Sequence, residues 1–134
     1  MPGYTPSKEP IKVIEQNPIG QQYISDKVSE SNLAASTYYY YFDMAGYNHC
    51  SFQFVLTGTL VLTIEGTMQD DGTAQAACSY DDISSMYGAA NWTADASLVD
   101  SAGVARGYKY LRVKVDATGG GGTADWDINT TRSV

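Results

Sequence analysis

The side chains that most often carry out chemistry in proteins are scarce in this sequence. Its single histidine, His49, precedes Cys50, and the second cysteine is Cys78. A structural zinc site needs four Cys or His ligands, and neighbouring residues of a strand point to opposite faces, so this set falls short of such a site. The two cysteines could form a disulfide, but the pairing cannot be read from sequence. We expect His49 to have a structural role.

Paired carboxylates are the second feature with chemical potential. They occur at positions 70–71 and 81–82 and on both sides of Trp126, as Asp125 and Asp127. Such pairs bind calcium or hydrolyse glycosides when their geometry is right, but none has the spacing of a dedicated calcium loop, and Asp is common in turns. No nucleophile elbow, phosphate-binding glycine loop or metalloprotease helix is present. The sequence therefore predicts no catalytic residue, no cofactor and no metal.

Tyrosine is the unusual residue type, with 11 copies and an unbroken run at 38–41. Its apolar ring and polar hydroxyl suit protein interfaces and sugar stacking. Four consecutive tyrosines in a strand place two side chains on each face, so we expect some to pack inside and others to meet a partner. The candidate interface aromatics are Tyr39, Tyr41, Tyr110 and Trp92.

Length and charge limit the classes of protein. At 134 residues one domain is expected, and the formal net charge of -7 disfavours nucleic acid as a partner. No apolar run approaches the roughly 20 residues that cross a bilayer, and the first residues do not resemble a signal peptide. We expect a chain that is made in the cytoplasm and has no membrane partner.

Alternating and aromatic runs predict the elements. Residues 36–42 read as a strand, and 51–56 and 60–65 read as a hairpin, because each places its large apolar residues on one face. A short strand is expected at 76–80, followed by a long connection over 84–106 that holds one weak strand. Further strands are expected at 108–115 and 124–130, on either side of the glycine run at 119–122. The predicted core is Phe52, Phe54, Leu60, Leu62, Ile64, Leu111, Val113, Val115 and Trp126.

These short strands without a long helix predict an all-β class, an antiparallel β-sandwich or jelly roll over residues 36–134. Residues 1–35 are polar, contain all four prolines and have few large apolar side chains, so we expect an extended N-terminal arm with at most a short helical turn at 25–35. Such an arm needs an external surface for its apolar residues. The candidate anchors are Ile11, Val13, Ile14, Tyr23 and Ile24.

Several short strings along the chain suggest a family. Phe-Asp-Met-Ala-Gly-Tyr at 42–47 is followed by Phe-Gln-Phe-Val-Leu-Thr-Gly-Thr at 52–59, Leu-Thr-Ile-Glu-Gly-Thr at 62–67 and Tyr-Leu-Arg-Val-Lys-Val at 110–115. Together with the strand pattern over about 37–132, they resemble small virion structural proteins of tailed bacteriophages, of the capsid decoration or cement type. The resemblance implies a β-sandwich on a capsid lattice, often a trimer, with an N-terminal arm reaching over neighbouring subunits. It carries over no individual binding residue.

We therefore expect a non-enzymatic phage virion protein that binds the major capsid protein, or another virion protein, and forms a homo-oligomer, a trimer if it follows the resemblance. Similar sandwich units occur in phage tails, head fibres and sugar-binding modules. The alternative is a carbohydrate-binding or host-receptor-binding module of a tail or head fibre, with exposed Tyr or Trp92 as a stacking platform.

Overall fold

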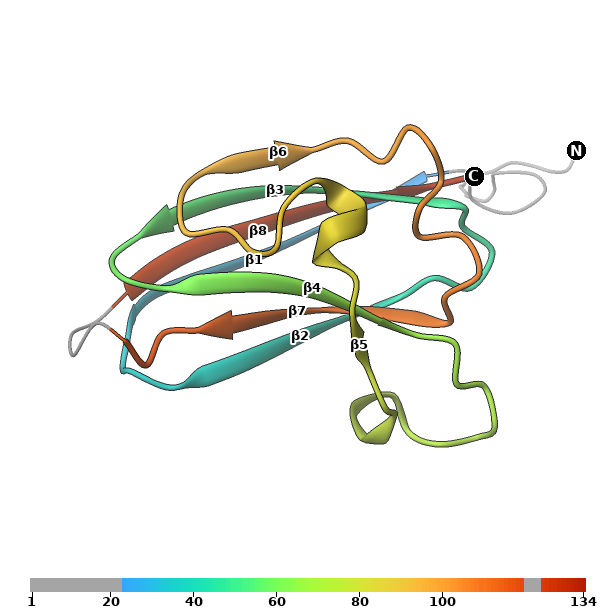
Figure 1. The fold of residues 1–134 in the computed structure, drawn as a ribbon, viewed down its shortest axis with the longest axis horizontal. Coiled ribbons are helices and arrows are strands. Elements are labelled where there is room, and N and C mark those ends of the chain that lie inside the picture. Colours follow the sequence, from blue (N-terminus) through green and yellow to red (C-terminus); the bar gives the residue numbers. More distant parts are fainter. Residues whose placement is uncertain (1–22, 120–123) are drawn as a thin grey trace, which may run out of the picture.

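The computed structural model describes residues 23–119 and 124–134, which form two four-stranded antiparallel sheets packed face to face (Figure 1). The all-β sandwich class is confirmed. Within these residues no helix is long and apolar enough to span a bilayer.

The first sheet, sheet A, has the strand order β1-β8-β3-β6. Its strands are β1 Tyr23–Leu33, β8 Ala124–Ser133, β3 His49–Thr57 and β6 Ala96–Leu98. The first and last strands in sequence are therefore neighbours, with Tyr23 opposite Ser133.

The second sheet, sheet B, has the order β2-β7-β4-β5. Its strands are β2 Thr37–Asp43, β7 Tyr110–Asp116, β4 Val61–Thr67 and β5 Asp81–Asp82, and the 3-10 turns η1 Gln75–Ala77 and η2 Ser84–Tyr87 flank β5. Apart from β4 to β5, every connection crosses from one sheet to the other. This double-sheet arrangement of eight antiparallel strands is the jelly-roll form of the sandwich.

The core lies between the two sheets, where alternation along each strand directs the large apolar side chains. The burial pattern of β7 shows this alternation, with Leu111, Val113 and Val115 buried and the residues between them partly exposed. All positions predicted for the core are buried: Phe52, Phe54, Leu60, Leu62, Ile64, Leu111, Val113, Val115 and Trp126.

The predicted boundary at residue 36 is wrong, because the sandwich already includes Tyr23–Leu33 as β1, a full edge strand paired with β8. The helical turn predicted at 25–35 is wrong for the same reason. This strand is hard to recognise in the sequence because its inward positions include the charged residues Asp26 and Glu30. In the structure they hydrogen-bond to Arg132 and Tyr40 at the partly buried edge of the sandwich. Residues 1–22 lie outside the described residues.

The predicted hairpin is also wrong. Residues 51–56 lie in β3 of sheet A and residues 61–65 in β4 of sheet B, so the turn at 58–60 connects the two sheets. Alternation shows which side chains face the core, but it is the same for two strands that pair and for two strands that pack across a core.

Two predictions for the long middle segment have different outcomes. Residues 76–80 are not a strand, because η1 and an extended loop occupy this region. The weak strand within 84–106 is confirmed as β6, which pairs with β3 over Phe52–Phe54.

Candidate functional site: a tyrosine and arginine surface

The tyrosine run divides between the two faces of sheet B. Tyr38 and Tyr40 point inward, where the Tyr38 ring lies 5.2 Å from that of Trp126 and the Tyr40 hydroxyl accepts a hydrogen bond from the Trp126 indole at 3.2 Å. Tyr39 and Tyr41 point outward, opposite Lys114 and Arg112 of β7. The expected division of the run, two side chains to each face, is confirmed.

Arg112 lies at the centre of the outer face. Its guanidinium is 4.5 Å from the ring centroid of Tyr39 and 4.3 Å from that of Tyr80, and its Nε donates to Glu65 Oε1 at 2.5 Å. The side chains of Arg112 and Glu65 are only 18% and 13% exposed. Burial lowers the pKa of the guanidinium, but the hydrogen bond and charge of Glu65 raise it by more, so the net pKa lies above its usual range. Arg112 is thus a fixed cation held between aromatic rings.

Tyr80 reaches this face from the loop before β5. Its ring lies 6.0 Å from Tyr41, and its hydroxyl donates to the Gln75 carbonyl at 2.9 Å. Burial raises the pKa of Tyr80 to about 12. Tyr80 was expected in a strand at 76–80 that the structure does not contain, so its contact with Arg112 was not predicted. The abundance of tyrosine was the one signal that could have pointed to it.

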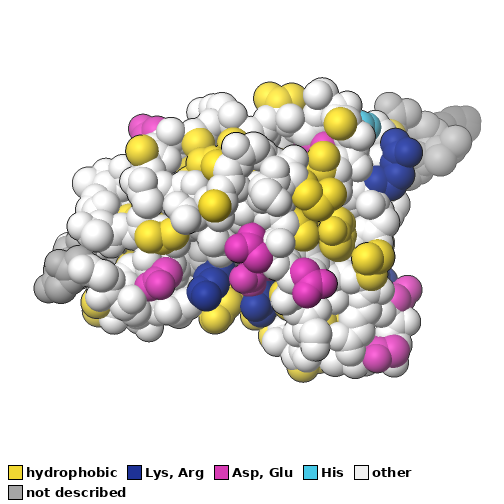
Figure 2. All heavy atoms as spheres, in the orientation of Figure 1, with side chains coloured by type: hydrophobic (Ala, Val, Ile, Leu, Met, Phe, Trp, Pro, Cys, Tyr) yellow, Lys and Arg dark blue, Asp and Glu magenta, His cyan; other side chains and the backbone are white. Residues whose placement is uncertain are grey.

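Tyr110 lies on the same outer face, opposite Asp43 of β2 and Thr67 of β4. Lys109 Nζ lies 5.5 Å from the Tyr110 ring and 3.6 Å from Asp70 Oδ1. We call this outer face of sheet B the Tyr–Arg surface, made of Tyr39, Tyr41, Tyr80, Tyr110, Arg112, Lys114 and Glu65. In Figure 2 acidic and basic side chains lie next to each other on the visible side, without a large patch of one sign.

Three of the four predicted interface aromatics, Tyr39, Tyr41 and Tyr110, are thus brought together, and Trp92 is not. Trp92 is 9% exposed, its backbone pairs with Leu62, and its ring lies 5.8 Å from Phe54. The prediction that Trp92 is a surface platform is wrong, because the long connection folds back and inserts its aromatic side chain into the core.

The five predicted arm anchors fall into two groups, because the sandwich begins at Tyr23. Tyr23 and Ile24 belong to β1, with Tyr23 53% exposed and Ile24 half-buried. They are therefore part of the sandwich. Ile11, Val13 and Ile14 lie outside the described residues.

His49 holds a loop, as expected. Its Nδ1 donates to the carbonyl oxygen of Asp100 at 2.7 Å. The buried carboxylate of Asp100 accepts from the backbone N–H groups of Cys50, Val104 and Ala105. Three hydrogen bonds satisfy this carboxylate, so the group fixes the connection between β6 and β7.

The cysteines are free and buried. Burial raises the pKa of the Cys50 thiol to about 12, which makes it a poor nucleophile near neutrality. Within residues 23–119 and 124–134, His, Cys, Asp and Glu side chains do not gather in groups of three or more that could hold a metal ion.

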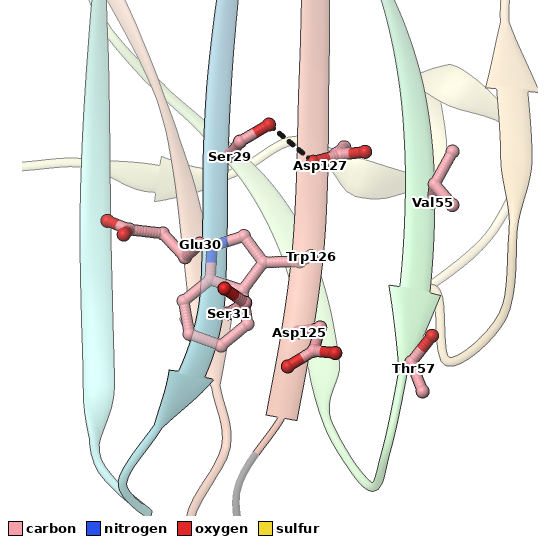
Figure 3. Close-up of a pocket in the computed structure, with 8 residues that line it drawn as sticks. All are labelled: Ser29, Glu30, Ser31, Val55, Thr57, Asp125, Trp126 and Asp127. Atoms are coloured by element: carbon pink, nitrogen blue, oxygen red, sulfur yellow. Dashed lines mark hydrogen bonds between the residues drawn. The ribbon is translucent and has the colours of Figure 1, made fainter.

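A shallow hollow of about 230 Å³ lies on the outer face of sheet A (Figure 3). Asp125 and Asp127 of β8 border it, and Ser29 Oγ donates to Asp127 at 2.5 Å while the backbone N–H of Asn32 donates to Asp125 at 2.8 Å. The hydrogen bonds to both carboxylates come from β1. The pair singled out in the sequence therefore joins two strands at the end of the sheet.

Comparison with known proteins gives structural similarities only. No protein-family model matches the chain, and no curated protein sequence matches it. A subunit from the Bacillus endospore appendages, described as a family of disulfide-linked pili, is 17% identical over 90% of this chain and 97% of its own, with a TM-score of 0.38. Aeromonas hydrophila PliG, a periplasmic inhibitor of g-type lysozyme, is 12% identical over 89% of this chain and 93% of its own, also with a TM-score of 0.38. Similarities this low carry no argument about function.

Proposed function

We propose that this chain is a non-enzymatic structural protein that binds another protein through the Tyr–Arg surface. The observation that carries the proposal is the position of Arg112 between the rings of Tyr39 and Tyr80, with its Nε bonded to Glu65. Tyrosine and arginine are enriched where binding energy concentrates in interfaces, and side chains fixed beforehand lose little entropy on binding.

The specific form of the proposal is a capsid decoration or cement protein that binds the major capsid protein and stabilises its lattice. The resemblance of the strings at 42–47, 52–59, 62–67 and 110–115 to phage virion proteins supports it. In this proposal residues 1–22 supply further contacts through Ile11, Val13 and Ile14. A homo-oligomer on the virion belongs to the same proposal, and its three-fold symmetry rests on the resemblance alone.

The sugar-binding alternative depended on an exposed stacking platform. Exposed Tyr and Trp92 were its two candidates; Trp92 is buried against Phe54, so this alternative now rests on exposed tyrosines such as Tyr39.

The first experiment is a mass-spectrometric inventory of purified virions from the same source. A copy number comparable to that of the major capsid protein is expected, whereas absence from the virion overturns the capsid assignment.

The second experiment tests the surface itself by co-sedimentation with capsids that lack the protein. We expect Tyr39→Ala combined with Arg112→Ala to lose binding. The matched control is Val55→Ala combined with Lys27→Ala, which removes one apolar and one basic side chain from the outer face of sheet A. Equal loss in both variants would contradict a role for the Tyr–Arg surface.

A further inference from the structure

The backbone of β2 has an open edge. β2 is the terminal strand of sheet B, and among the described residues no strand lies on its other side. Just beyond its ends, Met44 N–H donates to the Lys109 carbonyl at 3.0 Å and Ala117 N–H donates to the Ser36 carbonyl at 2.9 Å. These bonds continue the register of β2 with β7, in which Thr37 lies opposite Asp116.

The two bonds show which backbone groups of β2 point away from β7. The N–H and C=O of one residue point to the same side of a strand, and the side alternates along the chain. Since residues 36 and 44 bond toward β7, the even-numbered residues do so throughout β2. Thr37, Tyr39, Tyr41 and Asp43 therefore direct their N–H and C=O groups away from the sheet.

The residue types leave this edge unprotected. Exposed edges are usually blocked by charges, prolines or bulges, because they pair with other strands. The segment Thr37–Asp43 has one charge, no proline and no glycine. By contrast β1, an edge strand of sheet A, carries Asp26, Lys27 and Glu30 and an irregularity between Glu30 and Leu33.

Two-fold symmetry limits the register in which two copies of this edge can pair. A two-fold axis perpendicular to a continuous sheet keeps each face on the same side, so opposed residues must both be odd or both be even in number. An axis at Tyr40, the middle of β2, pairs all of Thr37–Asp43 with the same segment of a second copy. Tyr39 then lies opposite Tyr41 of the second copy, and Thr37 lies opposite its Asp43.

This arrangement pairs the backbone N–H and C=O groups of the four outward-bonding residues. The Asp43 carbonyl already accepts a hydrogen bond from Arg132 of its own chain, and its second lone pair is the one that would accept from Thr37 of the other copy. The arrangement also opposes aromatic to aromatic side chains, a favourable pairing across strands, and opposes no two like charges. The same operation on β1, with its axis at the central Val28, would place Asp26 opposite Glu30 of the second copy.

We propose that the open edge of β2 binds the same edge of a second copy of this chain, in antiparallel register about a two-fold axis at Tyr40. The two copies of sheet B then form one eight-stranded sheet. Its outer face carries two Tyr–Arg surfaces side by side, and both stay accessible because the pairing occurs in the plane of the sheet. The inference differs from the three-fold expectation, and an assay on the purified chain alone tests it independently of any capsid partner.

The experiment uses two variants that differ in a single side chain. In Tyr39→Glu with Tyr41→Glu, the new carboxylates lie beside Lys114 and Arg112 of their own chain but face each other across the two-fold axis. In Tyr39→Lys with Tyr41→Glu, a lysine faces a glutamate at both equivalent positions. Sedimentation velocity over micromolar concentrations should show a wild-type dimer, a Glu/Glu monomer, and a Lys/Glu dimer at least about tenfold tighter than any Glu/Glu association.

Cross-linking gives a second readout that does not depend on those variants. Thr37→Cys combined with Asp43→Cys should form covalent dimers on oxidation, because these positions are opposed between copies, whereas either substitution alone should not. The two positions are too far apart along one strand to bond within a chain. A wild-type monomer, a trimer mass, equal behaviour of the Glu/Glu and Lys/Glu variants, or no cross-link in the double cysteine variant would overturn the proposal.

Discussion

Arg132 of β8 and Asp43 of β2 lie in different sheets and are joined by a hydrogen bond from the guanidinium to the backbone carbonyl. The same guanidinium donates to the carboxylate of Asp26 on β1, and Arg132 is 8% exposed. One side chain thus connects three strands at the side of the sandwich where β1 and β2 form the edges.

Replacing Arg132 by Met should lower the free energy of unfolding by roughly 1.5–3 kcal/mol, because hydrogen bonds to a charged group are lost and Asp26 is left without its partner. Urea denaturation measures the change. Asp26→Asn, which keeps an oxygen acceptor, should cost less. A Met variant as stable as the wild type would show that the contact between the sheets is dispensable.

Phe54→Ala should cost roughly 3–5 kcal/mol, since the side chain is fully buried and packs against Phe52 and Trp92. The neighbouring Val55 is 41% exposed on the opposite face of β3, and Val55→Ala should change stability by no more than about 0.5 kcal/mol. Thermal unfolding of both variants checks the assigned faces, and an unchanged melting temperature for Phe54→Ala would contradict them.

Glu65 and Arg112 should be energetically coupled. A double-mutant cycle with Glu65→Gln and Arg112→Met should give a coupling energy of roughly 0.5–3 kcal/mol, because the pair is mostly shielded from water and makes a direct hydrogen bond. A cycle between Lys109 and Asp70, whose side chain is 71% exposed, should give a smaller value. Comparable coupling in the two cycles would argue that Arg112 is not held as described.

Stability should fall at alkaline pH. Burial raises the pKa of Tyr40 from 10.0 to about 12 and that of Cys50 from 9.0 to about 12. The folded chain keeps protons that the unfolded chain releases, so this stabilisation is fully present below about pH 9 and is lost as the pH rises toward 12.

Urea unfolding at pH 8 to 11 tests the expected slope. Tyr40→Phe removes one of the titrating groups, so stability should fall less steeply with pH in this variant, even though it loses the hydrogen bonds to Trp126 and Glu30. Identical slopes in the two proteins would exclude Tyr40 as a source of the alkaline sensitivity.

Two truncations should separate the sandwich from the residues before it. Deleting residues 1–35 removes β1, exposes the edge of β8 and should abolish cooperative unfolding. Deleting residues 1–22 keeps every described contact of β1 and should preserve the melting temperature. A folded protein lacking residues 1–35 would restore the boundary predicted from the sequence.

The buried faces could be predicted, but the neighbours of each strand could not. Leu111, Val113 and Val115 show their face by alternation, which depends only on the local pleat. The pairing of β3 with β8 depends on contacts distant in sequence, and two strands joined by a short turn have the same pattern whether they pair or pack. β1 was missed because Asp26 and Glu30 occupy inward positions, where their partners Arg132 and Tyr40 compensate for their burial.

In the candidate site, too, the face of each strand residue could be predicted, but contacts between distant segments could not. Tyr39 and Tyr41 were predictable as outward residues of one strand, because alternation assigns them to one face. The contribution of Tyr80 depends on how the irregular loop before β5 folds against Arg112, and no periodicity encodes it. Trp92 was misplaced because a polar surrounding sequence hid its backbone pairing with Leu62.

The central position of β8 in sheet A determines when the protein can fold. Among the described strands β1 pairs only with β8, and the Asp26 and Arg132 side chains that meet there are 106 residues apart in the sequence. While the chain is being synthesised, β1 must wait unpaired until Ala124–Ser133 has left the ribosome, so the sandwich closes only after nearly all of its sequence has been translated. β1 carries charged side chains, which disfavour pairing with other chains. The tyrosine-rich β2, whose partner β7 is also translated late, has one charge and is the less protected of the two strands during this interval.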